Sequence, residues 1–276
     1  MRFLAPRPLF AILAASLLGL ALISAAAAPG ARAADPMAAG PMAAGPMAAS
    51  GALTPAQKSA VDGLVHDYIL AHPEVILEAV QGLHDRQQQA AADNTEKLIA
   101  ANKRFLRNDP SSYVAGNPQG DVTIVEFFDY RCPYCKEMVP TIAALLKEDG
   151  KIRLVLKEYP VLGPDSLFAS RAAVAALELG HYEPFHDALM ASRGSLNETV
   201  VMAKAAQSGI DVAKLKTAMA DPHIMAELRA NRALGDELRI DGTPGFVIGD
   251  TLVPGAISGE QLRELVAAAR RQCHTC

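Results

Sequence analysis

The chain has 276 residues, half of them hydrophobic, which is enough for one domain of about 150 residues and additional segments. Asp and Glu (30) outnumber Lys and Arg (26), so the formal net charge is −4 at pH 7. This balance provides no basic surface for a phosphate backbone, and nucleic acid is therefore not an expected partner.

Residues 1–33 have the features of a signal peptide. Arg2 and Arg7 precede an apolar run from Leu9 to Ala28, and small residues supply a cleavage site after Ala33. Ala26 to Ala28 offers a second cleavage site. Because the run is about 20 residues long, an uncleaved membrane anchor is the alternative. Cleavage after Ala33 predicts a mature protein exported to an oxidising compartment, the periplasm.

A flexible linker is predicted over residues 34–53. Residues 36–50 repeat the unit Pro-Met-Ala-Ala-Gly, with Ser ending the last copy, and this composition is too small and too rich in Pro and Gly to bury a core. The three methionines of the repeat, Met37, Met42 and Met47, could bind Cu(I) through their thioether sulfurs. A low-complexity spacer is the favoured interpretation.

Residues 54–110 are predicted to be helical. Thr54 and Gln57 fit a capping box, and a second helix restarts at Pro73 and should end near Asn108. Apolar residues recur at helical spacing at Val61, Leu64, Val65, Tyr68, Ile69, Ile76, Val80 and Leu83. A stripe this narrow cannot form a core alone, so we expect self-association through residues 54–108. An intramolecular helix hairpin is the alternative.

A strand, a helix and a second strand follow in the main domain, which begins near Tyr113. Val122 to Phe128 is rich in β-branched and aromatic residues, as buried parallel strands are. A helix is predicted from Cys132 to about Glu148, and Ile152 to Tyr159 is the next strand. The order predicts a βαβ unit with cysteines at the turn between the first strand and the helix.

The remainder of the domain predicts an α/β fold with a helical insertion. Residues 165–239 carry only helical signals, separated by glycine stops. Two short strands, Phe246 to Ile248 and Thr251 to Val253, are joined by a Gly-Asp hairpin signal. A final helix is predicted from Ser258 to about Arg271.

Cys132 and Cys135 are the candidate catalytic residues. A thiol at a helix N-terminus loses its proton more easily, because unpaired N–H groups and the macrodipole stabilise the thiolate. Cys132 is placed to attack, and Cys135, one turn deeper, to resolve a mixed disulfide. Pro133 suits the first helical turn. Zinc is the alternative, but a zinc ribbon needs a second pair about 15–20 residues away, so no cofactor is expected.

Glu126 lies in the middle of the first buried strand. Alternation places it on the face opposite Val125 and Phe127, where burial should raise the pKa of its carboxyl. Glu126 could then relay a proton to Cys135, with Lys157 of the adjacent strand as its partner. A solvated pair at the sheet edge is the alternative.

Four motifs together resemble the DsbA-like disulfide oxidoreductases, which have a thioredoxin fold. They are Val125 to Tyr130, Cys132 to Lys136, Lys157 to Pro160 and Gly242 to Phe246, and the resemblance covers roughly residues 113–271. It implies that Pro244 is cis and lies beside Cys132, with the backbone of Thr243 pairing with a bound peptide. It also implies that the partners are unfolded or misoxidised exported proteins and a membrane redox protein.

The segment Tyr68 to Ile76 resembles the N-terminal region of the ScsC-type branch, named for suppression of copper sensitivity. In that branch the region makes oligomers, which agrees with the apolar stripe. The resemblance also makes a copper-binding or copper-tolerance protein an alternative function.

Two departures bear on the direction of the reaction. The dipeptide Pro133-Tyr134 replaces the Pro-His typical of DsbA oxidases, so the cationic histidine is missing and oxidising power should fall. Thr243 before the expected cis proline is similar to the bacterial disulfide isomerases. We therefore favour an isomerase or reductase, with a DsbA-type oxidase as the alternative.

The tail, residues 272–276, has no counterpart in the resemblance. Cys273, His274 and Cys276 could form a local disulfide, a metal site or an accessory redox pair. The remaining histidines are scattered without ligand spacing, and we interpret them as surface or packing residues: His66, His72, His84, His181, His186 and His223.

Overall fold

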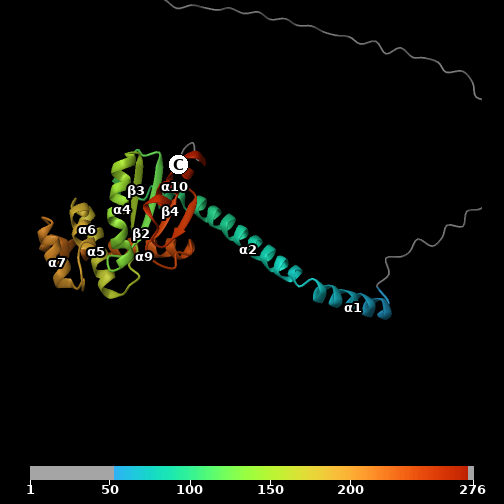
Figure 1. Cartoon of the computed structure of the whole chain (residues 1–276). Coiled ribbons are helices and arrows are strands. Elements are labelled where there is room, and N and C mark those ends of the chain that lie inside the picture. Colours follow the sequence, from blue (N-terminus) through green and yellow to red (C-terminus); the bar gives the residue numbers. More distant parts are fainter. Residues whose placement is uncertain (1–52, 273–276) are drawn as a thin grey trace, which may run out of the picture. The chain divides into compact units, whose positions relative to one another are not determined.

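The computed structural model describes residues 53–272 (Figure 1). The expected signal peptide, the linker up to residue 52 with its three methionines, and the tail with Cys273, His274 and Cys276 lie outside these residues. Within the described part, no helix combines the length and the apolar character needed to cross a membrane.

The N-terminal region consists of α1 (Pro55–Ala71), α2 (Glu74–Ala101) and α3 (Lys103–Arg107). The predicted capping box is present, since the Thr54 N–H donates to Gln57 Oε1 at 2.9 Å and the Gln57 N–H donates to Thr54 Oγ1 at 3.3 Å. The chain divides into two compact units between Val65 and His66, within α1. The second unit, residues 66–276, contains α2, α3 and the main domain.

The second predicted helix does not run unbroken to Asn108 but is interrupted at Asn102. The Asn102 side chain donates to the Leu98 carbonyl at 3.0 Å and to Glu237 Oε1 at 2.9 Å, at the end of another helix. Side-chain amides of this kind compete with the backbone for helical hydrogen bonds. Asn102 thus ends α2 and fixes this point of the chain to the main domain.

The main domain is built on a five-stranded sheet in the order β1-β3-β2-β4-β5. The strands are β1 (Tyr113–Gly116), β2 (Val122–Phe128), β3 (Ile152–Glu158), β4 (Gly245–Ile248) and β5 (Thr251–Pro254). β2 and β3 are parallel, as the βαβ pattern predicted, and the other neighbours are antiparallel. β1 was not predicted from the sequence.

The two faces of the sheet are covered by different helices. α4 (Pro133–Asp149) and α10 (Gly259–Gln272) pack on the face that carries Ile124 and Phe128. The other face carries Val125 and Phe127, which pack with residues of α2, α3 and α9. β2 is therefore buried on both sides, and successive residues of β2 belong to separate cores.

The helical insertion comprises α5 (Pro164–Glu178), α6 (Tyr182–Met190), α7 (Glu198–Gln207), α8 (Val212–Met219) and α9 (Pro222–Glu237). α5 lies at its centre and contacts the other four helices. Its buried positions are mostly alanines, which allow close helix packing. Asn197, Asp211 and Asp221 cap α7, α8 and α9.

Candidate active site

Cys132 caps the N-terminus of α4. Its backbone is extended (φ −71°, ψ 118°), and its Sγ accepts a hydrogen bond from the Cys135 N–H at 3.4 Å. The pKa of Cys132 is lowered from 9.0 to about 6, chiefly by a hydrogen bond from the Cys135 side chain, with further contributions from Thr243 and from backbone N–H groups. Burial of the sulfur acts in the opposite direction. Cys132 is therefore mostly a thiolate at neutral pH.

Cys135 lies one turn deeper in α4 and is fully buried. Its pKa is raised far above the ordinary value, first by its hydrogen bond to Cys132, then by burial, and also by the charge of Glu126. Both cysteines are free thiols in the structure. The pair thus consists of one nucleophilic sulfur and one sulfur that keeps its proton.

The Thr243-Pro244 peptide bond is cis, in agreement with the resemblance. The Thr243 carbonyl oxygen lies 3.1 Å from Cys132 Sγ and accepts a hydrogen bond from the thiol form. The backbone of Thr243 therefore lies directly beside the nucleophile. Two large side chains of this region are exposed: Tyr134, which follows Pro133 in the motif, is 58% exposed, and Leu162, whose backbone bonds Asp129 and Arg131, is 43% exposed.

Glu126 is buried on the α4 face of the sheet, where alternation predicted it. Its side chain lines a cavity of about 210 Å³ together with residues of α4 and His186 of α6. Its carboxylate has no hydrogen-bond partner within residues 53–272, and burial followed by the Cys132 charge raises its pKa from 4.5 to about 8. Glu126 therefore gives up its proton at slightly alkaline pH, whereas Cys132 gives up its proton at slightly acidic pH.

The expected pair between Glu126 and Lys157 is wrong. In the parallel register, Glu126 lies beside Leu156, and Lys157 points to the opposite face of the sheet. There its ammonium bonds the carboxylate of Asp109. The solvated-edge alternative is also wrong, because Glu126 is 5% and Lys157 1% exposed. Burial on two different faces separates these charges.

Asp129 is a site residue that the sequence did not single out. Its carboxylate accepts hydrogen bonds from the Arg131 N–H at 2.7 Å, from the backbone N–H groups of Val161 and Leu162 at 2.8 and 2.9 Å, and from Ser166 Oγ at 2.7 Å. These groups belong to the turn before Cys132, to the loop before α5 and, in the case of Ser166, to the first turn of α5. Asp129 thus joins the loop that leads into Cys132 to the loop that leads into α5.

A second unpredicted cluster surrounds Glu158. Tyr130 and Tyr182 each donate to Glu158 Oε1 at 2.8 Å, and the Tyr130 hydroxyl lies 3.1 Å from His186 Nδ1. Burial raises the pKa of Glu158 to about 8 and lowers that of His186 to about 4. His186 is a packing residue, as expected, and this cluster connects β3 with the helical insertion.

Lys136 supplies a positive charge next to the reactive sulfur. Its ammonium donates to the Ser192 carbonyl, just beyond α6. Burial lowers the pKa of Lys136, while the negative charges of Asp129 and Cys132 raise it. By the same coupling Lys136 favours the Cys132 thiolate. Within residues 53–272, no cluster of three or more His, Cys, Asp and Glu side chains could hold a metal ion.

Two family models match the chain. A model described as thioredoxin matches residues 108–268, more than half of the sequence. A model described as the N-terminal domain of copper resistance protein ScsC matches residues 57–90.

The solved structures of similar proteins are matched by this chain over nearly their whole lengths. A thioredoxin-like oxidoreductase from Silicibacter pomeroyi DSS-3 is 46% identical, covers 62% of this chain and 98% of its own, and has a TM-score of 0.60. A linker-deletion mutant of Proteus mirabilis ScsC is 26% identical over 82% of this chain and 100% of its own, with a TM-score of 0.62. Salmonella enterica Typhimurium BcfH is 28% identical over 78% of this chain and 96% of its own, with a TM-score of 0.65.

Curated relatives are matched over shorter parts. The thiol:disulfide interchange protein DsbA of Burkholderia cepacia is 29% identical over 48% of this chain and 64% of its own length. The Na(+)/H(+) antiporter NhaA 1 of Salinispora arenicola is 29% identical over 58% of this chain, yet the chain spans only 25% of that antiporter. The chain belongs to the thioredoxin family, in its DsbA-like, ScsC-type branch.

Proposed function

We propose that the protein is a thiol:disulfide oxidoreductase that acts on exported proteins in the periplasm. The observation that carries this proposal is the pair of opposite pKa shifts at Cys132 and Cys135, one to about 6 and the other far above the ordinary range. The names of DsbA and ScsC relatives support the same activity. The expected signal peptide with cleavage after Ala33 supports export.

The first step is attack of the Cys132 thiolate on a client disulfide. A new S–S bond forms between Cys132 and one client sulfur, and the other client sulfur leaves as a thiolate. We expect the client strand to pair with the backbone of Thr243, next to Pro244, because the Thr243 carbonyl lies beside Cys132 Sγ. Tyr134 and Leu162 offer apolar surface for that strand.

The second step is release by Cys135. Its thiol passes its proton to Glu126, and the resulting thiolate attacks the Cys132 sulfur of the mixed disulfide. The bond to the client breaks, the client leaves as a thiolate, and a Cys132–Cys135 disulfide remains. Glu126 suits this task, because a carboxyl with a pKa of about 8 is a base matched to near-neutral pH.

We favour isomerisation or reduction over oxidation. Isomerisation requires that the client stays attached long enough for its own thiols to attack, and Tyr134 in place of histidine weakens the oxidising character. DsbA-type oxidation is the second candidate, supported by the DsbA relatives. A membrane redox protein would recharge the pair in either direction.

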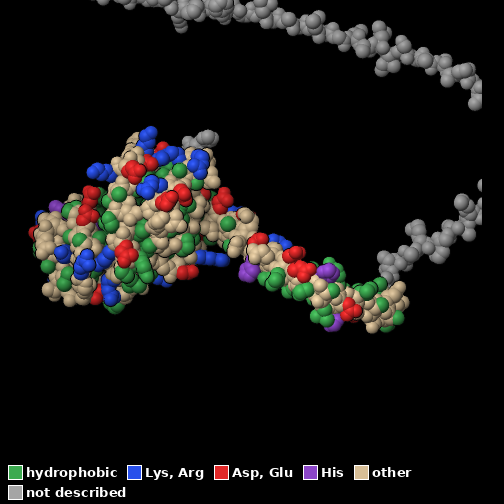
Figure 2. Space-filling view, viewed as in Figure 1, with side chains coloured by type: hydrophobic (Ala, Val, Ile, Leu, Met, Phe, Trp, Pro, Cys, Tyr) green, Lys and Arg blue, Asp and Glu red, His purple; other side chains and the backbone are tan. Residues whose placement is uncertain are grey.

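Self-association through residues 54–108 would place several active sites around one client. Large apolar side chains are exposed on α1 and the first half of α2, for example Leu64 at 71%, Leu70 at 69% and Leu77 at 72%. Figure 2 shows green side chains along both helices. Exposed apolar surface of this extent in water is typical of association sites. A second copy of the same helices is the partner we propose.

The experiment that tests the activity is alkylation of Cys132 as a function of pH. We expect a midpoint near pH 6, and a midpoint at or above about 8.5, the free-thiol value, contradicts the proposal. Scrambled-substrate refolding beside oxidation of a reduced substrate then separates isomerase from oxidase. Deleting residues 54–108 should lower refolding and leave oxidation intact if oligomers are needed for shuffling.

Copper binding is the remaining candidate, supported by the copper resistance description of the matched N-terminal model. Thiolate and thioether sulfurs prefer Cu(I). Stoichiometric Cu(I) binding that survives Cys132→Ser and Cys135→Ser favours a copper site outside the redox pair. Loss of binding in these variants restricts copper to the active site.

A further inference from the structure

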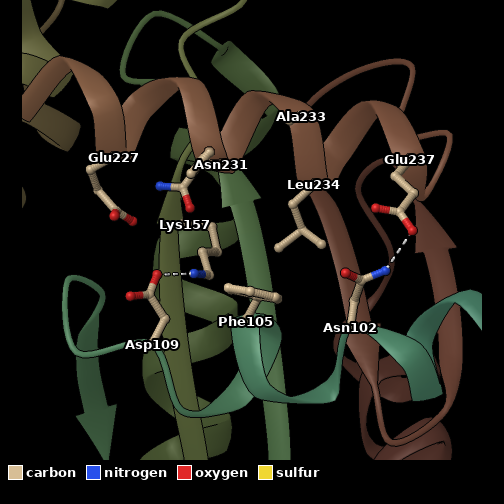
Figure 3. A pocket seen from close by; sticks show the side chains of 10 residues that line it. Asn102, Phe105, Asp109, Lys157, Glu227, Asn231, Ala233, Leu234 and Glu237 are labelled. Atoms are coloured by element: carbon tan, nitrogen blue, oxygen red, sulfur yellow. Dashed lines mark hydrogen bonds and ion pairs between the residues drawn. The ribbon is translucent and has the colours of Figure 1, made fainter.

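A cavity of about 350 Å³ lies between α3 and α9, on the face of the sheet opposite α4 (Figure 3). Its volume is in the range of pockets that hold small ligands or single side chains. Lys157 and Asp109 form one side of it, and Phe105 and Leu234 line another part. Because α4 covers the other face, the reactive sulfurs do not line this cavity.

Two polar groups at this cavity lack partners. Asn231 is 4% exposed, and its side-chain amide, which hangs from α9 next to Lys157, makes no hydrogen bond within residues 53–272 (Figure 3). Glu227 Oε1 is likewise buried without a hydrogen-bond partner among the described residues. A buried polar group left unsatisfied costs about 1–3 kcal/mol. This cost applies to Glu227 Oε1, and the Asn231 amide adds a donor and an acceptor at the same cavity. Together they suit a ligand that both donates and accepts hydrogen bonds.

The charged side chains around the cavity favour a ligand of positive charge. Three carboxylates, Asp109, Glu227 and Glu237, line it together with one ammonium, Lys157. Lys157 is already paired with Asp109, which leaves an excess of negative charge. Burial and the nearby Asp109 charge raise the pKa of Glu227, and a cation placed beside Glu227 would oppose this rise by stabilising the carboxylate. An anion would be repelled.

Phe105 favours a flat ligand. It is 59% exposed although it lines the cavity, so one side of its ring is open to whatever enters. An aromatic face attracts a flat cation, and guanidinium groups stack on such faces more readily than ammonium groups do.

We propose that this cavity binds an arginine side chain of a partner polypeptide. The guanidinium lies against Phe105 and donates hydrogen bonds to Glu227, while a carbonyl of the same polypeptide accepts from the Asn231 amide. A polypeptide carries a guanidinium group and carbonyl groups in one molecule, which a simple inorganic cation does not. The site is separate from the thiol chemistry and does not depend on it.

The test is an NMR titration of the full mature chain with blocked pentapeptides that have arginine at the centre and leucine on either side. We expect a saturable shift of the Asn231 side-chain amide, whose signal is identified by its loss in Asn231→Ala. Replacing the arginine by its neutral isostere citrulline should weaken binding about tenfold or more, because a hydrogen bond to a charged group is lost.

Protein variants complete the test. Glu227→Gln should weaken binding of the arginine peptide about tenfold, and Phe105→Leu several-fold. Glu260→Gln on α10 removes the same charge away from the cavity and should leave binding unchanged. An unchanged Cys132 alkylation rate in each variant shows that the domain is folded. Absence of a saturable shift up to about 10 mM peptide, or equal binding of the citrulline peptide, overturns the proposal.

Discussion

The two faces of the central sheet bury an ionisable side chain in opposite ways. Glu126 on β2 faces α4 without a hydrogen-bond partner among the described residues, and its pKa rises to about 8. Lys157 on β3 faces the other side and is paired with Asp109. The comparison teaches that a buried charge with a partner stays charged, whereas a buried carboxyl without a partner has its pKa raised toward neutral pH.

The largest change in stability should come from breaking the ion pair between Lys157 and Asp109. Asp109→Ala leaves the Lys157 ammonium buried without its partner, which should lower the free energy of unfolding by about 3–5 kcal/mol. Glu227 stands nearby and keeps the loss in the lower part of that range. Urea unfolding at pH 7 measures it. The control is Asp109→Ala with Lys157→Met, which should recover most of the loss. A loss below about 1 kcal/mol in the single variant contradicts the role of the pair.

Removing the unpaired carboxyl of Glu126 should change the free energy of unfolding in the opposite direction. The folded pKa of Glu126, about 8, lies above the ordinary value of 4.5, so Glu126 destabilises the fold progressively as pH rises from about 4.5 to 8. Glu126→Gln should therefore raise the free energy of unfolding by about 3 kcal/mol at pH 7 and by little at pH 4. Urea unfolding at both pH values checks this. Equal effects at pH 4 and pH 7 would falsify the raised pKa.

The same substitution should slow the chemistry. Without the Glu126 carboxylate, Cys135 loses its proton acceptor, and release of a client from Cys132 should slow about a hundredfold. A preformed mixed disulfide and a single-turnover release assay measure the rate. The alkylation midpoint of Cys132 should stay near pH 6, because Glu126 is uncharged there. Unchanged release excludes Glu126 as the base.

The smallest effect on the pKa of Cys132 is expected from substitutions on the face of the sheet that carries Lys157. The variant with Asp109→Ala and Lys157→Met removes two charges that the sheet separates from the thiols, so the Cys132 midpoint should move by less than about 0.3 pH unit. Alkylation against pH measures this as well. A shift of a full unit would mean that Lys157 tunes the redox site after all.

Much of the site was predictable because it depends on local patterns. The apolar strand Val122 to Phe128 predicted β2, its alternation predicted burial of Glu126, and the motif after it predicted a cysteine at a helix N-terminus. These features need only the period of a strand and the geometry of a helix start.

The rest depends on contacts between distant segments. The partner of Lys157 follows from the register of β2 with β3 and from the place of Asp109 beyond α3, neither of which a single sequence determines. The long-range hydrogen bonds of Asp129 and Glu158 join residues that are 24 to 37 positions apart, and no sequence period encodes such contacts. The break at Asn102 is stabilised by Glu237, which is 135 positions away.

The hydrogen bond between the two cysteine side chains links the pKa of each sulfur to the state of the other. It is the largest cause of the raised pKa of Cys135 and of the lowered pKa of Cys132, so each sulfur holds the other in its resting state. Once a client is attached, the sulfur of Cys132 is no longer a charged acceptor, and this restraint on Cys135 ends. In the proposed mechanism, attack by Cys135 therefore becomes easier only after a client has bonded to Cys132.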